Sequence, residues 1–241
     1  MRKFAFVLVL ALLVSVLVSA TAVSPADMLG TWYLGYFDYD SHQASIIEEY
    51  KVELNRDKTA VLVLGGEEQQ TTWELTDSGA EVVIGDSSTS FYMQEDGSLK
   101  AYVAIGAEGN KYDCFFFREQ PKPVEIPEKA DVADEDEYFG TYALTLQTKG
   151  NMLIPFENGE EILKITIEFA QITVSGSSVY EGSQMSDFKD GKLIIPAKDL
   201  VYSAEGNLFI EKTGTGIMAT CEGIPDTVYY LSPVGDPEVK E

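Results

Sequence analysis

An internal repeat is the feature that most constrains how this chain can fold. It opens with two segments that lie 110 positions apart, residues 28–34 (MLGTWYL) and 138–144 (YFGTYAL). Weaker matches follow in the same order: residues 50–54 with 163–167, 75–84 with 186–195, and 92–99 with 202–208. Each half then ends in an aromatic stretch, residues 113–117 and 226–231. Because the matches keep their order, the sequence predicts a duplicated unit of about 100 residues.

The hydrophobic pattern inside each half has a period of two. Leu99, Ala101 and Val103 occupy alternate positions, which is typical of a strand with one buried face. Turn signals such as Asp96-Gly97 separate these runs at roughly ten-residue intervals. A meander of this length must close on itself or pair with a second sheet, because open edges aggregate. We therefore predict an all-β protein of two tandem, small, antiparallel up-and-down β-barrels; the alternative is one large sandwich shared by both halves.

A proline-rich acidic stretch separates the two halves. Pro121, Pro123 and Pro127 stiffen and extend the chain, and the acidic residues from Asp131 to Glu137 repel one another. These acids lack the spaced Asp-x-Asp-x-Asp-Gly pattern of a calcium loop, so we interpret the stretch as a semi-rigid linker. The predicted division is a first barrel at residues 23–120, a linker at 121–137 and a second barrel at 138–241.

The first 22 residues have the three parts of an export signal. Arg2 and Lys3 are cationic, residues 4–18 form an apolar run, and residues 20–22 (ATA) are small. The apolar run spans 15 residues, whereas a membrane-spanning helix needs about 20, so cleavage is favoured over an uncleaved anchor. We predict a signal peptide at residues 1–22 and a secreted or extracytoplasmic mature protein.

The mature chain is strongly acidic. The whole sequence has 17 Lys and Arg against 40 Asp and Glu, and removal of Arg2 and Lys3 leaves 15 basic side chains and a formal net charge of −25. Each contact with a phosphate needs a cation, which this surface mostly lacks. Nucleic acid and anionic membrane surfaces are therefore disfavoured as partners, and we expect no membrane span after removal of the signal.

Residues that could carry out chemistry are few and scattered. His42 is the one histidine, and no serine lies in a Gly-x-Ser-x-Gly elbow. One histidine and two distant cysteines cannot supply the ligands of a zinc site, so we expect no metal or other cofactor. Carboxylate pairs such as Glu48-Glu49 arise by chance among 40 acidic residues. We predict that the protein is not an enzyme, and that the only helix of the first half lies near residues 41–50.

The start of the repeat carries a family resemblance. Gly30-Thr31-Trp32 opens a meander of seven or eight short strands, and in this it resembles the bacterial lipocalin-like domain family. In that family the tryptophan closes one end of the barrel beneath an arginine from the end of the last strand. Arg118, which follows residues 115–117, stands where that arginine is expected.

The second half departs from this pattern. Tyr142 replaces the tryptophan, and Ser232 or Pro233 stands at the position of the arginine, which leaves open whether the second barrel closes. The resemblance implies a structural lid at one end of each barrel. Its residues are Gly30, Trp32, Arg118, Gly140 and Tyr142.

The resemblance weakly implies ligand binding, and two functional hypotheses follow. In the first, a secreted non-enzymatic binding protein carries a small hydrophobic ligand inside a barrel, although eight-stranded barrels are often filled by their own side chains. In the second, an extracellular protein- or polysaccharide-interaction module has no small-molecule ligand, and the aromatic cluster Tyr33, Tyr36, Phe37 and Tyr39 takes part in recognition or covers the barrel mouth. The candidate interior residues, which a packed core explains better, are Trp73, Leu75, Leu99 and Val103.

The two cysteines, Cys114 and Cys221, lie near the ends of the two halves. An oxidising compartment permits a disulfide, which would close a loop of about 107 residues and stabilise the fold by about 4–5 kcal/mol. The alternative, slightly favoured here, is two buried free thiols that behave as small hydrophobic side chains.

Overall fold

The protein is described from a computed structural model, which covers residues 23–106, 109–132, 134–169, 171–198 and 205–235. The predicted signal peptide at residues 1–22 and part of the match at residues 202–208 lie outside these ranges. The described chain is built of strands, with three short helical turns: α2 (Pro25–Met28), η1 (Glu135–Tyr138) and η2 (Gly159–Glu161). The all-β prediction is confirmed.

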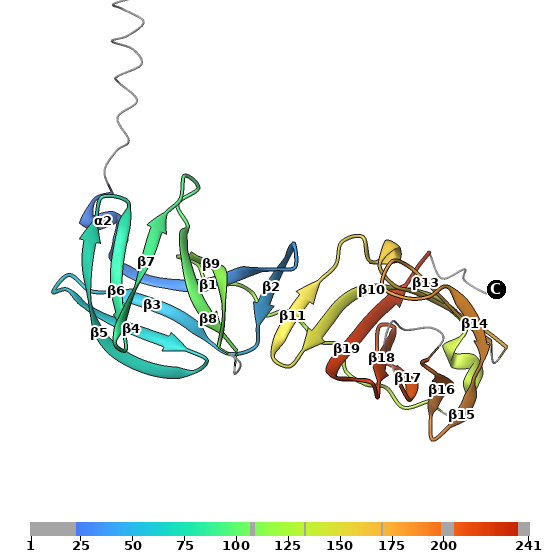
Figure 1. Cartoon of the computed structure of the whole chain (residues 1–241). Helices are drawn as coiled ribbons and strands as arrows, with labels where there is room; N and C mark the ends of the chain where they lie inside the picture. Colours follow the sequence, from blue (N-terminus) through green and yellow to red (C-terminus); the bar gives the residue numbers. More distant parts are fainter. Residues whose placement is uncertain (1–22, 107–108, 133, 170, 199–204, 236–241) are drawn as a thin grey trace, which may run out of the picture.

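The first half is a closed antiparallel barrel of eight strands (Figure 1). Successive strands pair with one another, and β9 pairs back onto β1 to close the sheet. This confirms the predicted up-and-down barrel for the first half. The strands are β1 (Gly30–Tyr39), β3 (Tyr50–Leu54), β4 (Thr59–Leu64), β5 (Glu67–Thr76), β6 (Gly79–Ile84), β7 (Ser87–Met93), β8 (Leu99–Ile105) and β9 (Asn110–Phe117).

The helix predicted near residues 41–50 is wrong, because this segment contains β2 (His42–Ile46). Asp40 and Ser41 both have positive φ angles, 45° and 67°, which is the geometry of a tight two-residue hairpin turn. The turn sends the chain straight back along β1, where Ala44 faces Phe37. This segment is therefore a strand because it pairs with β1 on one side and with the second half on the other.

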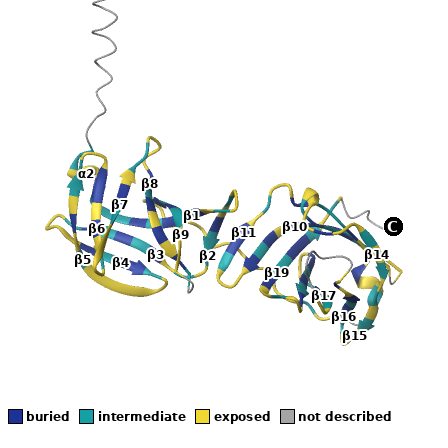
Figure 2. Ribbon diagram, in the orientation of Figure 1, coloured by how far each residue is buried: buried dark blue, intermediate teal, exposed yellow. Residues whose placement is uncertain are grey.

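The core of the first half lies inside the barrel. Along β8 the side chains alternate between buried and accessible, as the period of two predicts (Figure 2). The interior is filled by large rings, and Trp32, Trp73, Phe37, Phe91 and Phe116 are all at most 2% exposed. Close packing of this kind supplies the main stabilising free energy of such a domain.

The described residues of the second half form ten strands on a similar plan. β10 pairs with β12 on one side and with β19 on the other, and two antiparallel series extend from them, β12 to β14 and β15 to β19. The described residues show no pairing between β14 and β15, so the predicted closure of a second barrel goes beyond what the pairings establish. The strands are β10 (Gly140–Lys149), β11 (Met152–Pro155), β12 (Lys164–Glu168), β13 (Gln171–Ser175), β14 (Gly182–Met185), β15 (Asp187–Lys189), β16 (Lys192–Pro196), β17 (Asn207–Lys212), β18 (Ile217–Cys221) and β19 (Ile224–Pro233).

The two halves share local geometry at the predicted offset. The β1–β9 ladder shifts register between Leu34 and Tyr36, and the β10–β19 ladder shifts between Leu144 and Leu146, 110 positions later. A short helical turn precedes the first strand of each half, α2 before β1 and η1 before β10. The same irregularities thus recur at the same places in both halves.

The halves meet along β2 and β11. These strands pair antiparallel, with Ser45 opposite Leu153 and Ile46 opposite Met152. Ile154 of β11 is buried in the hydrophobic cluster of the first barrel. The linker adds a second attachment, because the Lys129 ammonium pairs with the buried carboxylate of Glu211. The two halves are therefore held together by backbone pairing, apolar burial and the linker.

Candidate functional site

The four residues predicted to face a ligand inside the first barrel lie together in its packed core. Trp73, Leu99 and Val103 are buried, and Leu75 is partly buried against the same cluster. The indole N–H of Trp73 donates to the carbonyl oxygen of Asn55 at 2.9 Å. These side chains belong to or pack against one hydrophobic cluster that also contains large aromatic rings, so their burial is explained by core packing.

The predicted lid residues of the first half meet at the end of the barrel near α2. The guanidinium carbon of Arg118 lies 3.6 Å from the ring centroid of Trp32, and the guanidinium donates to the carbonyl oxygens of Asp27 and Leu29. The Trp32 indole N–H donates to the Met28 carbonyl oxygen at 2.9 Å. Gly30 has φ +106°, and a Cβ atom there would lie 2.8 Å from the Arg118 guanidinium. This end of the barrel is closed by stacking and hydrogen bonds.

The second half closes the equivalent end with a different cation. The Tyr142 hydroxyl donates to the Tyr138 carbonyl oxygen at 3.0 Å, four residues earlier, as Trp32 does in the first half. Pro233 pairs opposite Tyr142 and so occupies the position that corresponds to Arg118. The cation comes instead from Lys212, whose ammonium donates to the Tyr142 hydroxyl at 3.0 Å. No local sequence pattern indicates Lys212, because it lies at the end of a different strand, β17.

The two cysteines are separate free thiols in the structure. Cys114 is buried in the core of the first half and Cys221 in that of the second. Burial raises the pKa of the Cys114 thiol to about 12. The two thiols thus lie in separate hydrophobic cores and are not joined to each other.

The aromatic cluster predicted from residues 33–39 is divided between three places. Phe37 and Tyr39 pack against Tyr112 at ring-centroid distances of 5.1 and 5.9 Å. Tyr36 stacks on Phe115 on the other face of the sheet, at 4.7 Å. Tyr33 lines a groove beside the linker. The alternation of a strand separates side chains that are neighbours in sequence.

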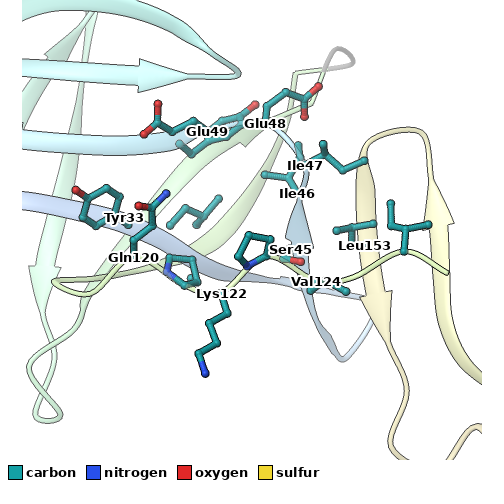
Figure 3. Close-up of a pocket in the computed structure, with 16 residues that line it drawn as sticks. Tyr33, Ser45, Ile46, Ile47, Glu48, Glu49, Gln120, Lys122, Val124 and Leu153 are labelled. Atoms are coloured by element: carbon teal, nitrogen blue, oxygen red, sulfur yellow. The ribbon is translucent and has the colours of Figure 1, made fainter. Parts of the chain in front are cut away.

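A groove of about 340 Å³ lies where the first barrel, the linker and β11 meet (Figure 3). Its walls are largely apolar, with Leu34 from the barrel, Ile46 from β2, Val124 and Ile126 from the linker, and Leu153 from β11. This volume lies in the range of small-molecule sites. The lining consists of residues 33–35, 45–50, 120–124, Ile126 and Leu153.

The groove exists because the connection that follows β2 in the first half is shorter than the one that follows β11 in the second half. Only three residues, 47–49, join β2 to β3, whereas eight residues, 156–163, join β11 to β12. In the second half the extra residues form η2, and Gly159 packs so closely that a Cβ atom there would overlap the Leu144 carbonyl. The second half therefore fills the space beside its bulged strand, and the first half leaves it open.

Two polar atoms from residues that line the groove are buried without a hydrogen-bond partner among the described residues, Ser45 Oγ and Glu48 Oε2. The other carboxylate oxygen of Glu48 accepts a hydrogen bond from the Asn151 amide of the second half. Glu49, the neighbouring acid, is paired with the Lys51 ammonium at 3.0 Å. Unpartnered buried polar atoms cost about 1–3 kcal/mol each, so a ligand group that reached them through a shift of these side chains would gain affinity. In the sequence Glu48 stood out only as a member of one of many carboxylate pairs, and nothing indicated Ser45.

His42, the histidine considered for chemistry, makes a ring contact and a backbone contact. His42 packs its ring against Phe156, at a centroid distance of 4.8 Å, and its Nδ1 lies 2.9 Å from the Asp40 carbonyl oxygen. Within the described ranges, no three His, Cys, Asp or Glu side chains gather closely enough to hold a metal ion. The described part of the chain also has no helix that is long and apolar enough to cross a membrane. The groove is equipped for binding by apolar contact and hydrogen bonding.

Comparison with known proteins does not assign the chain to a family. No protein-family model matches the sequence, and no curated protein is significantly similar to it.

Proposed function

We propose that this protein is a secreted or extracytoplasmic, non-enzymatic binding protein built from two lipocalin-like domains, and that it binds a small ligand in the groove between them. The eight-stranded barrel, the Trp32–Arg118 contact and the lid of the second half support the lipocalin-like assignment. The apolar run and small residues of the first 22 positions support export.

The groove with its two unpartnered oxygens is the observation that carries the proposal. Ligand sites are typically concave and mostly apolar, with a few polar groups that set the orientation of the ligand. The groove has this composition, whereas the interior of the first barrel is occupied by Trp32, Trp73 and other large rings. The ligand expected here is therefore a small molecule with an apolar body and at least one hydrogen-bonding group.

Native mass spectrometry of the mature protein, purified gently from its own host, tests the proposal. A mass excess that is present in the native spectrum and absent after denaturation would identify a bound small molecule. Val124→Trp provides the site test, because Val124 is exposed on the linker and a larger ring there would narrow the groove without disturbing the core. The excess should disappear in this variant. A native mass equal to that of the chain alone, or an excess unchanged in Val124→Trp, would contradict the proposal.

An extracellular protein- or polysaccharide-interaction module is the second candidate, favoured by aromatic rings on the outside of the first barrel. Strand register places Tyr92 opposite Lys100, Lys100 opposite Phe115, and Phe115 opposite Tyr36. Tyr102, on the same outer face, is 58% exposed. Exposed aromatic rings are enriched where proteins recognise large partners.

Co-sedimentation with insoluble polysaccharides tests this second candidate in its polysaccharide form. Tyr92→Ala combined with Tyr102→Ala should abolish co-sedimentation, and Tyr180→Ala, at an exposed tyrosine of the second half, is the matched control. If the double variant and Tyr180→Ala co-sediment equally, the outer face of the first barrel is not a polysaccharide site.

A further inference from the structure

We infer that the ligand of the groove is a cationic amphiphile, whose ammonium-type group binds the Glu48 carboxylate while its hydrocarbon part lies along the apolar walls. This inference rests on the proposed function, because it names the class of ligand that the same groove would take. It follows from the charge state of the groove, the acceptor character of its polar atoms and the arrangement of its walls.

The Glu48 carboxylate is the charged group that lacks a counter-ion. One of its oxygens accepts the Asn151 amide, the other is buried without a partner, and no Lys or Arg of the described residues forms an ion pair with it. Glu49 differs, because Lys51 neutralises it. A carboxylate accepts hydrogen bonds and cannot donate them, so the complementary group must carry N–H or O–H donors. An ammonium group supplies both the donors and the missing positive charge.

The remaining lining suits a hydrocarbon chain. Leu34 of the first barrel, Ile46 of β2 and Leu153 of the second half form apolar walls, and Val124 of the linker also lines the groove. In Figure 3 Glu48 and Glu49 stand at one end of the groove, and the Lys122 side chain extends away from it. The one lysine of the lining therefore does not compete for Glu48. A ligand with a cation at one end and an apolar body would match both parts of the site.

The net charge of the whole protein also favours a cationic ligand. The mature chain has a formal net charge of −25, which raises the local concentration of cationic ligands and repels anionic ones. A fatty acid or an alkyl phosphate would place a negative group beside Glu48 and leave the carboxylate oxygen without a donor. The groove thus discriminates against anionic amphiphiles of the same length.

The inference is tested by isothermal titration calorimetry of the mature protein with three probes of equal chain length: octylammonium, octanol and octanoate. Octylammonium should bind most tightly and octanoate most weakly. Glu48→Gln keeps the size of the side chain and an acceptor for Asn151, and it should weaken octylammonium binding about tenfold or more while changing octanol binding less than about twofold. The matched control is Glu161→Gln, which removes the same charge from the exposed η2 turn and should change octylammonium binding less than about twofold.

The outcomes separate this inference from the proposed function. If octanol and octylammonium bind equally and Glu48→Gln has no effect, while Val124→Trp weakens both, the groove is the binding site and its cation preference is refuted. If Glu161→Gln weakens binding as much as Glu48→Gln, the preference comes from the overall field of the protein and not from Glu48. If no probe binds, or Val124→Trp changes nothing, both the groove and the cation preference are refuted.

Discussion

Replacing Arg118 with methionine tests whether the guanidinium closes the first barrel. The variant loses the stacking contact on Trp32 and the hydrogen bonds to the carbonyl oxygens of Asp27 and Leu29. Such a stacking contact contributes about 1 kcal/mol. A hydrogen bond from a charged donor contributes about 1.5 kcal/mol, and we take half of that for each bond because Arg118 is exposed to solvent. The expected loss is about 2–3 kcal/mol.

The loss should be visible as a fall in melting temperature. For a protein of this length, 1 kcal/mol corresponds to about 2–4 °C, so Arg118→Met should melt about 4–12 °C lower when unfolding is followed by circular dichroism. Urea unfolding at 25 °C then measures the free energy directly. Arg56→Met is the matched control, because Arg56 lies in an exposed turn and its removal changes the net charge equally. If Arg118→Met and Arg56→Met agree within about 0.5 kcal/mol, the stacked guanidinium contributes nothing and the reasoning is refuted.

Three further predictions concern single side chains. Since burial raises the pKa of Cys114 from its ordinary value of 9.0 to about 12, the native state keeps a proton that the unfolded chain loses, and stability should fall as pH rises from about 9 towards 12. The fall should be shallower in Cys114→Ala when urea unfolding is measured under reducing conditions. Burial alone would raise the pKa of Glu211, but hydrogen bonds from Lys129 and Lys192 lower this pKa below its ordinary value of 4.5. The two lysines therefore stabilise the folded state above pH 4.5, and this stabilisation is lost as the pH falls below 4.5. Lys129→Met should reduce the pH-dependent loss of stability in acid unfolding curves. Phe169 is 85% exposed and has a φ of 44°, a left-handed conformation that asparagine tolerates better. Phe169→Asn should therefore raise the free energy of unfolding by about 1 kcal/mol. An unchanged or lower free energy of unfolding would contradict the argument from backbone strain.

The lid illustrates what could be predicted and what could not. Arg118 directly follows β9, which pairs with β1. Its contact with Trp32 therefore joins two neighbouring strands, and the sequence motif predicted this contact. Lys212 performs the comparable task in the second half from the end of β17, which neither adjoins β10 nor matches Arg118 in the repeat. A cation that approaches from a non-adjacent strand leaves no local signal in the sequence.

The segment at residues 41–50 illustrates a second limit. Its composition permits a helix, but the hairpin turn at Asp40 and Ser41 and the pairing of β2 with β11 make it a strand. The partner on β11 lies more than 100 positions away along the chain. Local propensity is a weak preference, and a backbone ladder formed on both sides of a segment overrides it.

By itself, the sequence determined the all-β class and the barrel of the first half. These follow from alternation and turn residues, which act over a few positions along the chain. Only the tertiary structure decided that β2 and β11 join the halves, that five fewer residues between strands leave a groove beside Leu34, and that Ser45 and Glu48 keep buried oxygens without partners. The physical reason is that burial and hydrogen-bond satisfaction depend on what packs against a residue from distant parts of the chain, and no local pattern records that.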